Sequence, residues 1–262
     1  MIIDFHTHCF PDELAPKATS VLAERAGIPQ RLKGTVSDLK KSMKKAGIEK
    51  SVVLGIATRP TQTCKINDWS KEINDVQIVA FGSVHPDFED WESELERIKA
   101  MGLKGIKLHP DYQDFFVDEP RMFKIYKKAF ELGLIVLFHA GVDVGLPPPV
   151  HCMPAALRRV VDAFPEGNIV AAHMGGYNCW EDVEKYLSGT SIYMDTSYSL
   201  EQIGKEAFLR IAGVHGTDRI LFATDSPWTD QEEEIKRLKT FGLGPETEQA
   251  LLGGNAARLL GL

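Results

Sequence analysis

Cysteine is scarce in this chain, with 4 residues among 262. The cysteines are scattered and form no CxxC pair: Cys9, Cys64, Cys152 and Cys179. This spacing argues against a disulfide framework and against a zinc site built from cysteine pairs. Because reduced thiols are typical of cytoplasmic proteins, we expect a cytoplasmic location.

Long apolar runs are also missing. No apolar stretch approaches the roughly 20 residues that a membrane-spanning helix needs. The N-terminal segment MIIDFHTHCFPDE has neither a basic region nor a long apolar one, so we expect no secretory signal. These absences predict that the protein does not interact with a membrane.

Motifs that bind nucleotide phosphates are absent as well, since neither GxGxxG nor GxxxxGK occurs. A net charge of −7 argues against a broad nucleic-acid-binding surface. Hydrophobic residues at 44% and charged residues at 26% are ordinary for a globular protein with a large core. The expected partner is a small-molecule substrate, and a homodimer is left open.

The chain alternates short β-branched runs with longer segments of helical periodicity. Eight runs are predicted strands: 2–5, 51–56, 78–83, 104–108, 134–138, 168–172, 191–195 and 219–223. The main predicted helices lie between them: 37–46, 90–101, 120–132, 154–164, 200–213 and 231–241. Helix-length connections require parallel strand pairing, and eight such units close readily into a barrel.

The sequence therefore predicts an α/β protein with a (β/α)8 TIM-barrel fold and a single domain over residues 1–262. The connection 10–36 is longer than the others and contains three prolines, Pro11, Pro16 and Pro29. We expect it to form a loop-helix insertion over the mouth of the barrel.

Polar residues gather at the predicted C-terminal ends of the strands. Six of the eight histidines lie there: His6, His8, His85, His109, His139 and His173. The last two strands end in acidic and hydroxyl residues, Asp195-Thr196-Ser197 and Thr224-Asp225-Ser226. Since this end of a TIM barrel carries the active site, the clustering predicts a catalytic centre.

His6 and His8 form an HxH motif at the end of the first strand. Side chains at i and i+2 of a strand point to the same face, so both imidazoles can reach one zinc-class ion. The alternative is a pair of hydrogen-bonded histidines without a metal. Asp4 shares their parity and could orient a ligand, or it could be a buried capping acid.

Three further candidates follow later strands: His139 in FHAG, His173 in AHMGG and Asp225 in TDSPW. The eighth strand lies beside the first in a barrel, so Asp225 is expected close to His6 and His8. Each residue alone has an ordinary explanation, such as a hydrogen-bonded core histidine or a helix cap. The combination favours a metal site.

The motifs HTH, FHAG, AHMGG and TDSPW resemble, in this order, those of the amidohydrolase superfamily. They are most similar to the amidohydrolase-related (amidohydrolase 2) branch, which includes aminocarboxymuconate-semialdehyde decarboxylase and γ-resorcylate decarboxylase. The resemblance covers residues 3 to about 230. It implies one divalent metal held by His6, His8, His139 and Asp225, with His173 as the nearby acid or base. Zinc is the expected ion, with manganese and iron as alternatives.

Lys107, in GIKLHP, matches the position at which some superfamily members carry a carboxylated lysine that bridges two metals. An unmodified lysine would instead repel a metal or bind a substrate carboxylate. We favour one metal and leave a second open. Candidate substrate-binding residues are His109, which shares the inward parity of Lys107, and the loop residues Arg59, Tyr112 and Trp228. Each could equally be an ordinary packed or solvated side chain.

Three imidazoles and a carboxylate leave an open coordination position, where a divalent ion can lower the pKa of water towards roughly 7. With Asp225 as general base and His173 as acid or electrostatic stabiliser, we expect hydrolysis of a small polar substrate that bears a carboxylate, such as an amide or lactone. The alternative at the same site is non-oxidative decarboxylation of an aromatic or unsaturated carboxylic acid. A non-catalytic metal-binding protein is a third class.

Overall fold

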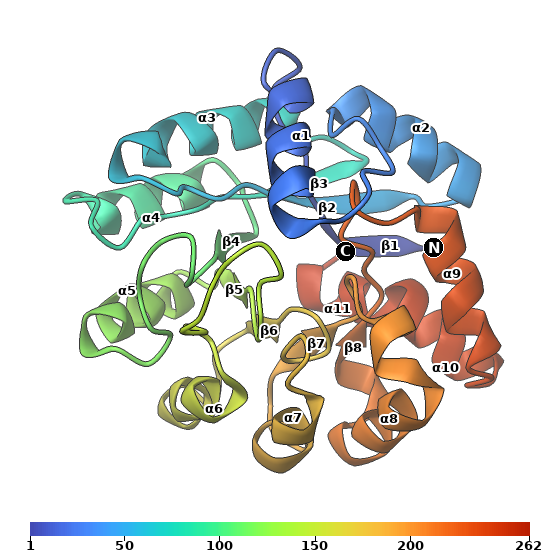
Figure 1. Cartoon of the computed structure of the whole chain (residues 1–262). Helices are drawn as coiled ribbons and strands as arrows, with labels where there is room; N and C mark the ends of the chain where they lie inside the picture. The colour runs from blue at the N-terminus through green and yellow to red at the C-terminus, as the bar shows by residue number, and fades with distance from the viewer.

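The computed structural model describes residues 1–262 and places the strands at the centre of a ring of helices (Figure 1). The strands pair in parallel and in chain order, as a three-stranded sheet β1-β2-β3 and a five-stranded sheet β4-β5-β6-β7-β8. Their bounds are β1 (Ile3–Thr7), β2 (Lys50–Leu54), β3 (Ile78–Phe81), β4 (Gly105–Leu108), β5 (Ile135–Phe138), β6 (Ile169–Ala171), β7 (Tyr193–Asp195) and β8 (Ile220–Leu221). All eight predicted strands are confirmed, with ends that differ by a few residues.

Single parallel bridges join the two sheets at both seams. Gly82 pairs with Ile106 between β3 and β4, and Thr7 pairs with Ser226 between β1 and the segment after β8. A side chain at Gly105 would hinder the first seam, because its Cβ would lie 2.6 Å from Cε2 of Phe81 in β3. The predicted α/β barrel is confirmed, with its least regular pairing at these two seams.

The predicted helices are confirmed, and further helices accompany them. The bounds of the helices are α1 (Ala15–Ala26), α2 (Val36–Ala46), α3 (Thr63–Ile73), α4 (Trp91–Ala100), α5 (Pro120–Glu131), α6 (Pro154–Ala163), α7 (Trp180–Tyr186), α8 (Leu200–His215), α9 (Gln231–Thr240), α10 (Pro245–Gln249) and α11 (Asn255–Leu260). None of them combines the length and the apolar character that a membrane crossing requires.

The connection after β1 contains α1, which lies in front of the strands in Figure 1. The predicted loop-helix insertion is therefore present. The helix begins near Pro16, which suits a first turn, and ends at Gly27 in the left-handed conformation with φ 65°. Only Ala15 and Thr19 of this helix are buried, so it packs lightly on the barrel.

Two groups of apolar side chains stabilise the barrel. A cluster of 14 buried residues includes Ile3 and Phe5 of β1 and Leu137 of β5, together with residues of α11. A larger cluster of 46 buried residues packs the strands against the surrounding helices. The barrel therefore has a dense core on both sides of the strands, which fixes the positions of the strand ends.

Asp4 connects the two ends of the chain across the β1–β8 seam. Its carboxylate accepts hydrogen bonds from the backbone N–H of Thr224 (3.0 Å), the hydroxyl of Thr224 (2.6 Å) and the amide of Gln231 in α9 (2.7 Å). Burial raises the pKa of Asp4 to about 7, although these donors act in the opposite direction. Asp4 does not touch the imidazole of His6, because the pairing of β1 with β2 shifts register between Asp4 and Thr7. Its role is structural.

Asp4→Ala should destabilise the fold, because the substitution leaves the donors of Thr224 and Gln231 buried without an acceptor. Buried donors without partners cost about 1–3 kcal/mol each, so we expect the free energy of unfolding to fall by about 3–5 kcal/mol in urea denaturation. Asp12→Ala, at an exposed position, is the control and should change it by less than about 0.5 kcal/mol. Equal stability of the two variants would contradict this role of Asp4.

Candidate metal centre

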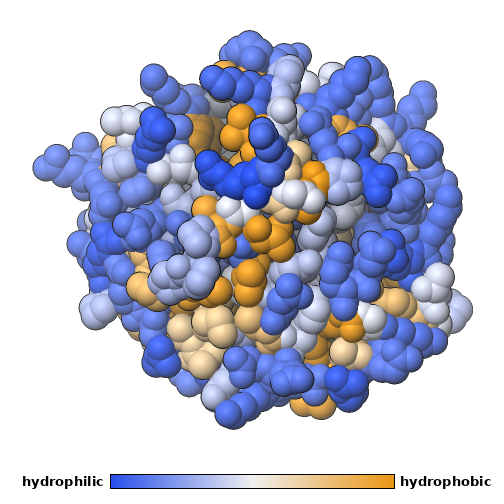
Figure 2. Space-filling view, viewed as in Figure 1, coloured by the Kyte–Doolittle hydropathy of each residue, from blue (hydrophilic) through white to orange (hydrophobic).

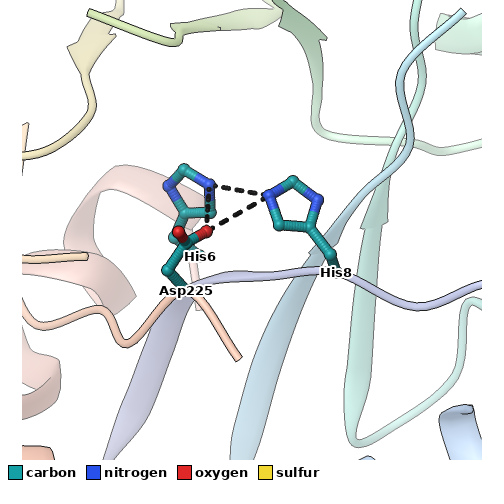
Figure 3. Close-up of side chains that lie close together, drawn as sticks. All are labelled: His6, His8 and Asp225. Carbon is teal, nitrogen blue, oxygen red and sulfur yellow. Dashed lines mark hydrogen bonds and ion pairs between the residues drawn. The ribbon is translucent and has the colours of Figure 1, made fainter. Parts of the chain in front are cut away.

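His6, His8 and Asp225 converge at the mouth of the barrel (Figure 3). The Nε2 atoms of the two histidines are 3.1 Å apart, and Oδ1 of Asp225 lies 3.3 Å from each of them. The histidines come from the end of β1, and Asp225 follows β8. The structure thus brings together three of the four residues that the sequence predicts as metal ligands.

The other ring nitrogen of each histidine has a buried acceptor. Nδ1–H of His6 donates to Oδ2 of Asp195 at 2.9 Å, and Nδ1–H of His8 donates to the carbonyl oxygen of Leu54 at 2.9 Å. Since a carboxylate and a carbonyl only accept, the protons are assigned to Nδ1, and both Nε2 atoms carry lone pairs. Burial and the charge of Lys107 hold the pKa of His6 well below its usual value, which keeps it neutral.

Two lone pairs and a carboxylate oxygen therefore face one another with no proton between them. Such a set is mutually repulsive by itself and becomes favourable around a cation. Neutral imidazole and carboxylate are the ligands that zinc, manganese and iron accept, and the acceptors behind Nδ1 orient the rings as at known metal sites. The residues fit a divalent metal.

The backbone of Asp225 is unusual. Its φ of 67° lies in the left-handed region, which aspartate tolerates better than most side chains, and its N–H donates to the carbonyl oxygen of His6 at 2.8 Å. This turn directs the carboxylate towards the histidine pair. Burial acts to raise the pKa of Asp225, but its contacts with His8 and His6 lower it below its ordinary value. The group is a carboxylate at neutral pH.

His139 lines the same cavity as these three residues, but its contacts are with other histidines. Its Nδ1 is 3.0 Å from Nε2 of His173, and its own Nε2 is buried without a hydrogen-bond partner. Nδ1–H of His173 donates to the carbonyl oxygen of Ser197 at 2.8 Å, so Nε2 of His173 accepts the proton of His139. The free lone pair on Nε2 of His139 is what a fourth ligand would offer.

His109 stacks on His139, with ring centroids 4.1 Å apart and planes 9° from parallel. Nδ1 of His109 accepts the backbone N–H of Tyr112 at 3.3 Å, and its Nε2 lies 3.1 Å from Oδ2 of Asp143. The Nε2 proton of His109 therefore faces the carboxylate. His109, His139 and Asp143 form a second group of potential ligand atoms, but this proton already satisfies Asp143.

Lys107 is fully buried, with Nζ 3.5 Å from Nε2 of His6. Burial lowers the pKa of Lys107 to about 8, while Asp195 and Asp225 act in the opposite direction. The side chain is therefore mostly an ammonium at neutral pH. It lies next to the candidate metal ligands, where the sequence places it.

A cavity of about 620 Å³ opens above these residues. Tyr112 and Trp228 line it, as does His109, whereas Arg59 is exposed and does not line it. Three residues of the site have roles that the sequence analysis does not assign: Asp195, Ser197 and Asp143. The position of Asp195 at the end of β7 is visible in the sequence, but its contact with His6 depends on the closed barrel.

The family model described as amidohydrolase matches residues 3–262. An uncharacterised TIM-barrel protein from Bordetella bronchiseptica is 20% identical with a TM-score of 0.77, over 99% of this chain and 98% of that chain. A dihydroxybenzoic acid decarboxylase from a Polaromonas species, solved with manganese and the inhibitor 2-nitroresorcinol, is 17% identical with a TM-score of 0.77, over 100% and 97% of the two chains.

A probable 2-pyrone-4,6-dicarboxylic acid hydrolase from Acinetobacter baumannii, solved with citric acid, is 17% identical with a TM-score of 0.70, over 100% of this chain and 99% of that chain. At these identities the similarity of the structures concerns the fold. The match of the family model extends from the first strand to the last residue, and this chain therefore belongs to the amidohydrolase family.

Proposed function

We propose that this amidohydrolase-family enzyme removes carbon dioxide, without oxidation, from an organic carboxylic acid at a divalent metal held by His6, His8 and Asp225, with His139 as the fourth ligand. The observation that carries the proposal is the convergence of two imidazole lone pairs and a carboxylate in a mostly apolar cavity. When bound, the ion would supply a positive charge that holds the carboxylate of the substrate and stabilises the negative charge developed in the reaction.

The surroundings of the site favour loss of carbon dioxide. Of the 29 residues that line the cavity, 16 are hydrophobic, so a bound carboxylate loses most of its hydration. Desolvation disfavours a localised charge more than the dispersed charge of the breaking carbon–carbon bond. The ammonium of Lys107 provides a counter-charge for the substrate carboxylate.

His173 is the proposed proton donor. Its Nδ1–H remains bonded to the carbonyl oxygen of Ser197, which keeps the ring oriented. Its Nε2 lies 3.0 Å from Nδ1 of His139, so it would take a second proton once the ring of His139 turns to bind the metal and withdraws its own Nδ1–H. As the bond to the carboxyl carbon breaks, its electron pair stays on the substrate carbon and takes this proton. The products are carbon dioxide and the protonated carbon compound, and His173 recovers its proton from solvent.

Hydrolysis is the second candidate, and the position of the Asp225 carboxylate in the lining of the cavity favours it as a specific observation. A carboxylate that borders the cavity can accept a proton from an attacking water, while His173 protonates the leaving group. Both reactions occur, by name, among the proteins of the same fold: a dihydroxybenzoic acid decarboxylase and a probable pyrone dicarboxylic acid hydrolase.

His6→Ala and Asp225→Asn should lose the metal while the fold is retained, since each removes one ligand at the mouth of the barrel. Elemental analysis of the purified protein should find about one transition metal per chain in the wild type and a small fraction of that in the variants. About two metals per chain would favour a carboxylated Lys107. Asp143→Asn, a carboxylate in the same cavity, is the matched control. Full metal content in His6→Ala would overturn the ligand assignment.

His173→Asn should keep the metal and lose turnover, because asparagine cannot carry the transferred proton. General acids contribute about 10²–10⁴-fold, so we expect kcat to fall by at least about 100-fold at unchanged metal content. His215→Asn, at the end of α8 and outside the cavity lining, should retain wild-type turnover. An active His173→Asn enzyme would remove His173 from the mechanism.

The two reactions can be separated with two panels of compounds. We expect the metal-loaded enzyme to release carbon dioxide from aromatic or unsaturated carboxylic acids, and the release should stop after the metal is removed with a chelator. Lactones and amides, followed by proton release, form the second panel. Turnover confined to that panel would replace decarboxylation by hydrolysis.

A further inference from the structure

The cavity extends well beyond the candidate metal ligands. Figure 2 shows hydrophobic residues near the centre of the face that carries the mouth of the barrel. The apolar part of the cavity is formed largely by α1 with its flanking residues and by the β2–α3 region: Phe10, Leu14, Leu22, Ala26, Ile28, Ile56, Ile66 and Trp69. The side chains that carry the chemistry lie at the strand ends. The cavity therefore has a polar end and an apolar end.

Helix α1 and Leu14, the residue before it, present apolar side chains that the protein itself does not cover. Leu14 and Leu22 belong to neither of the two hydrophobic clusters, and Leu14 is 55% exposed although it lines the cavity. Large apolar side chains of a helix usually contribute to a core. Leu14 and Leu22 instead line the cavity.

The volume of the cavity bears on the size of the ligand. About 620 Å³ lies in the middle of the roughly 300–1,000 Å³ range of sites that enclose drug-sized molecules. Charged residues of the lining are few: Lys65, Lys107, Asp143 and Asp225. Lys107 and Asp225 lie at the polar end, whereas Lys65 is an exposed residue of α3. A small polar acid would leave the wall of α1 without contacts.

We propose that the substrate carries a non-polar aryl or alkyl group remote from its reacting carboxylate, and that this group binds between α1 and α3. The inference rests on the proposed function for the placement of the carboxylate. The occupant is the substrate itself, because the apolar wall is continuous with the cavity that holds the candidate metal ligands. The insertion after β1 then determines which carboxylic acids the enzyme accepts.

The test uses 4-alkylbenzoates, from benzoate to 4-hexylbenzoate, as probes of the metal-loaded protein. Binding is measured by isothermal titration calorimetry, with quenching of tryptophan fluorescence as a second readout, since Trp69 and Trp228 line the cavity. Each methylene removed from water should tighten binding about fourfold until the cavity is filled. A flat series, or no binding of any member at millimolar concentration, would overturn the proposal.

Leu22→Asp should reduce the gain per methylene to about twofold or less, because the variant places a charge on the apolar wall. Val21→Asp is the matched control: it changes the neighbouring residue of α1, which is 45% exposed and does not line the cavity, and should leave the series unchanged. Ile66→Asn tests the opposite wall, so the proposal does not depend on one variant. Equal effects of Leu22→Asp and Val21→Asp would also count against the subsite.

These outcomes separate the subsite from the proposed reaction. Binding affinity that rises steeply with alkyl length, without carbon dioxide release from any acid, would support the apolar subsite and contradict the decarboxylation. Carbon dioxide release together with a binding affinity that does not change with alkyl length would support the reaction and contradict the subsite.

Discussion

The chemistry of this site depends on where two histidine protons reside. Asp195 and the carbonyl oxygen of Leu54 accept Nδ1–H from His6 and His8, and this leaves both Nε2 lone pairs directed at one point near Asp225. If either acceptor were replaced by water, the ring could turn or change tautomer, and the arrangement would lose its affinity for a cation. The ligands come from β1 and the segment after β8, but their properties are set from β2 and β7.

This arrangement requires the seam between β1 and β8 to stay closed. The backbone N–H of Asp225 bonds to His6, and two residues deeper the buried carboxylate of Asp4 holds Thr224 and Gln231. The register shift after Asp4 lets the strand present Phe5 to the core and still direct His6 and His8 towards Asp225. Fold stability and site geometry are therefore coupled at this seam.

Much of the barrel and of the site could be predicted from the sequence, because both follow from local patterns. Strand periodicity locates the eight strands, and the HxH motif and Asp225 lie at strand ends whose meeting follows from closure. Of the two roles that the sequence leaves open for Asp4, the structure supports the buried acid, whose partners are Thr224 and Gln231. Its shared parity with His6 and His8 would hold only in a regular strand, and the register of β1 shifts after Asp4. The contact of Asp195 with His6 and the contacts of His139 with His109 and His173 depend on side-chain rotation, which no spacing encodes. From the sequence we expect a small polar substrate, with hydrolysis first and decarboxylation as the alternative. The choice depends on the walls of the cavity, whose side-chain directions follow from no sequence spacing.

The light packing of α1 has a consequence for how this protein can change. Its side chains contribute little to the core, so substitutions along this insertion should seldom threaten folding, whereas the residues at the strand ends are tied to buried partners. Selection or engineering can then alter molecular recognition through one surface helix while bond breaking at the rim is left untouched. A barrel organised in this way can acquire new substrate preferences by few mutations. Mutagenesis aimed at new substrates would best begin at Leu14, Leu22 and Ala26.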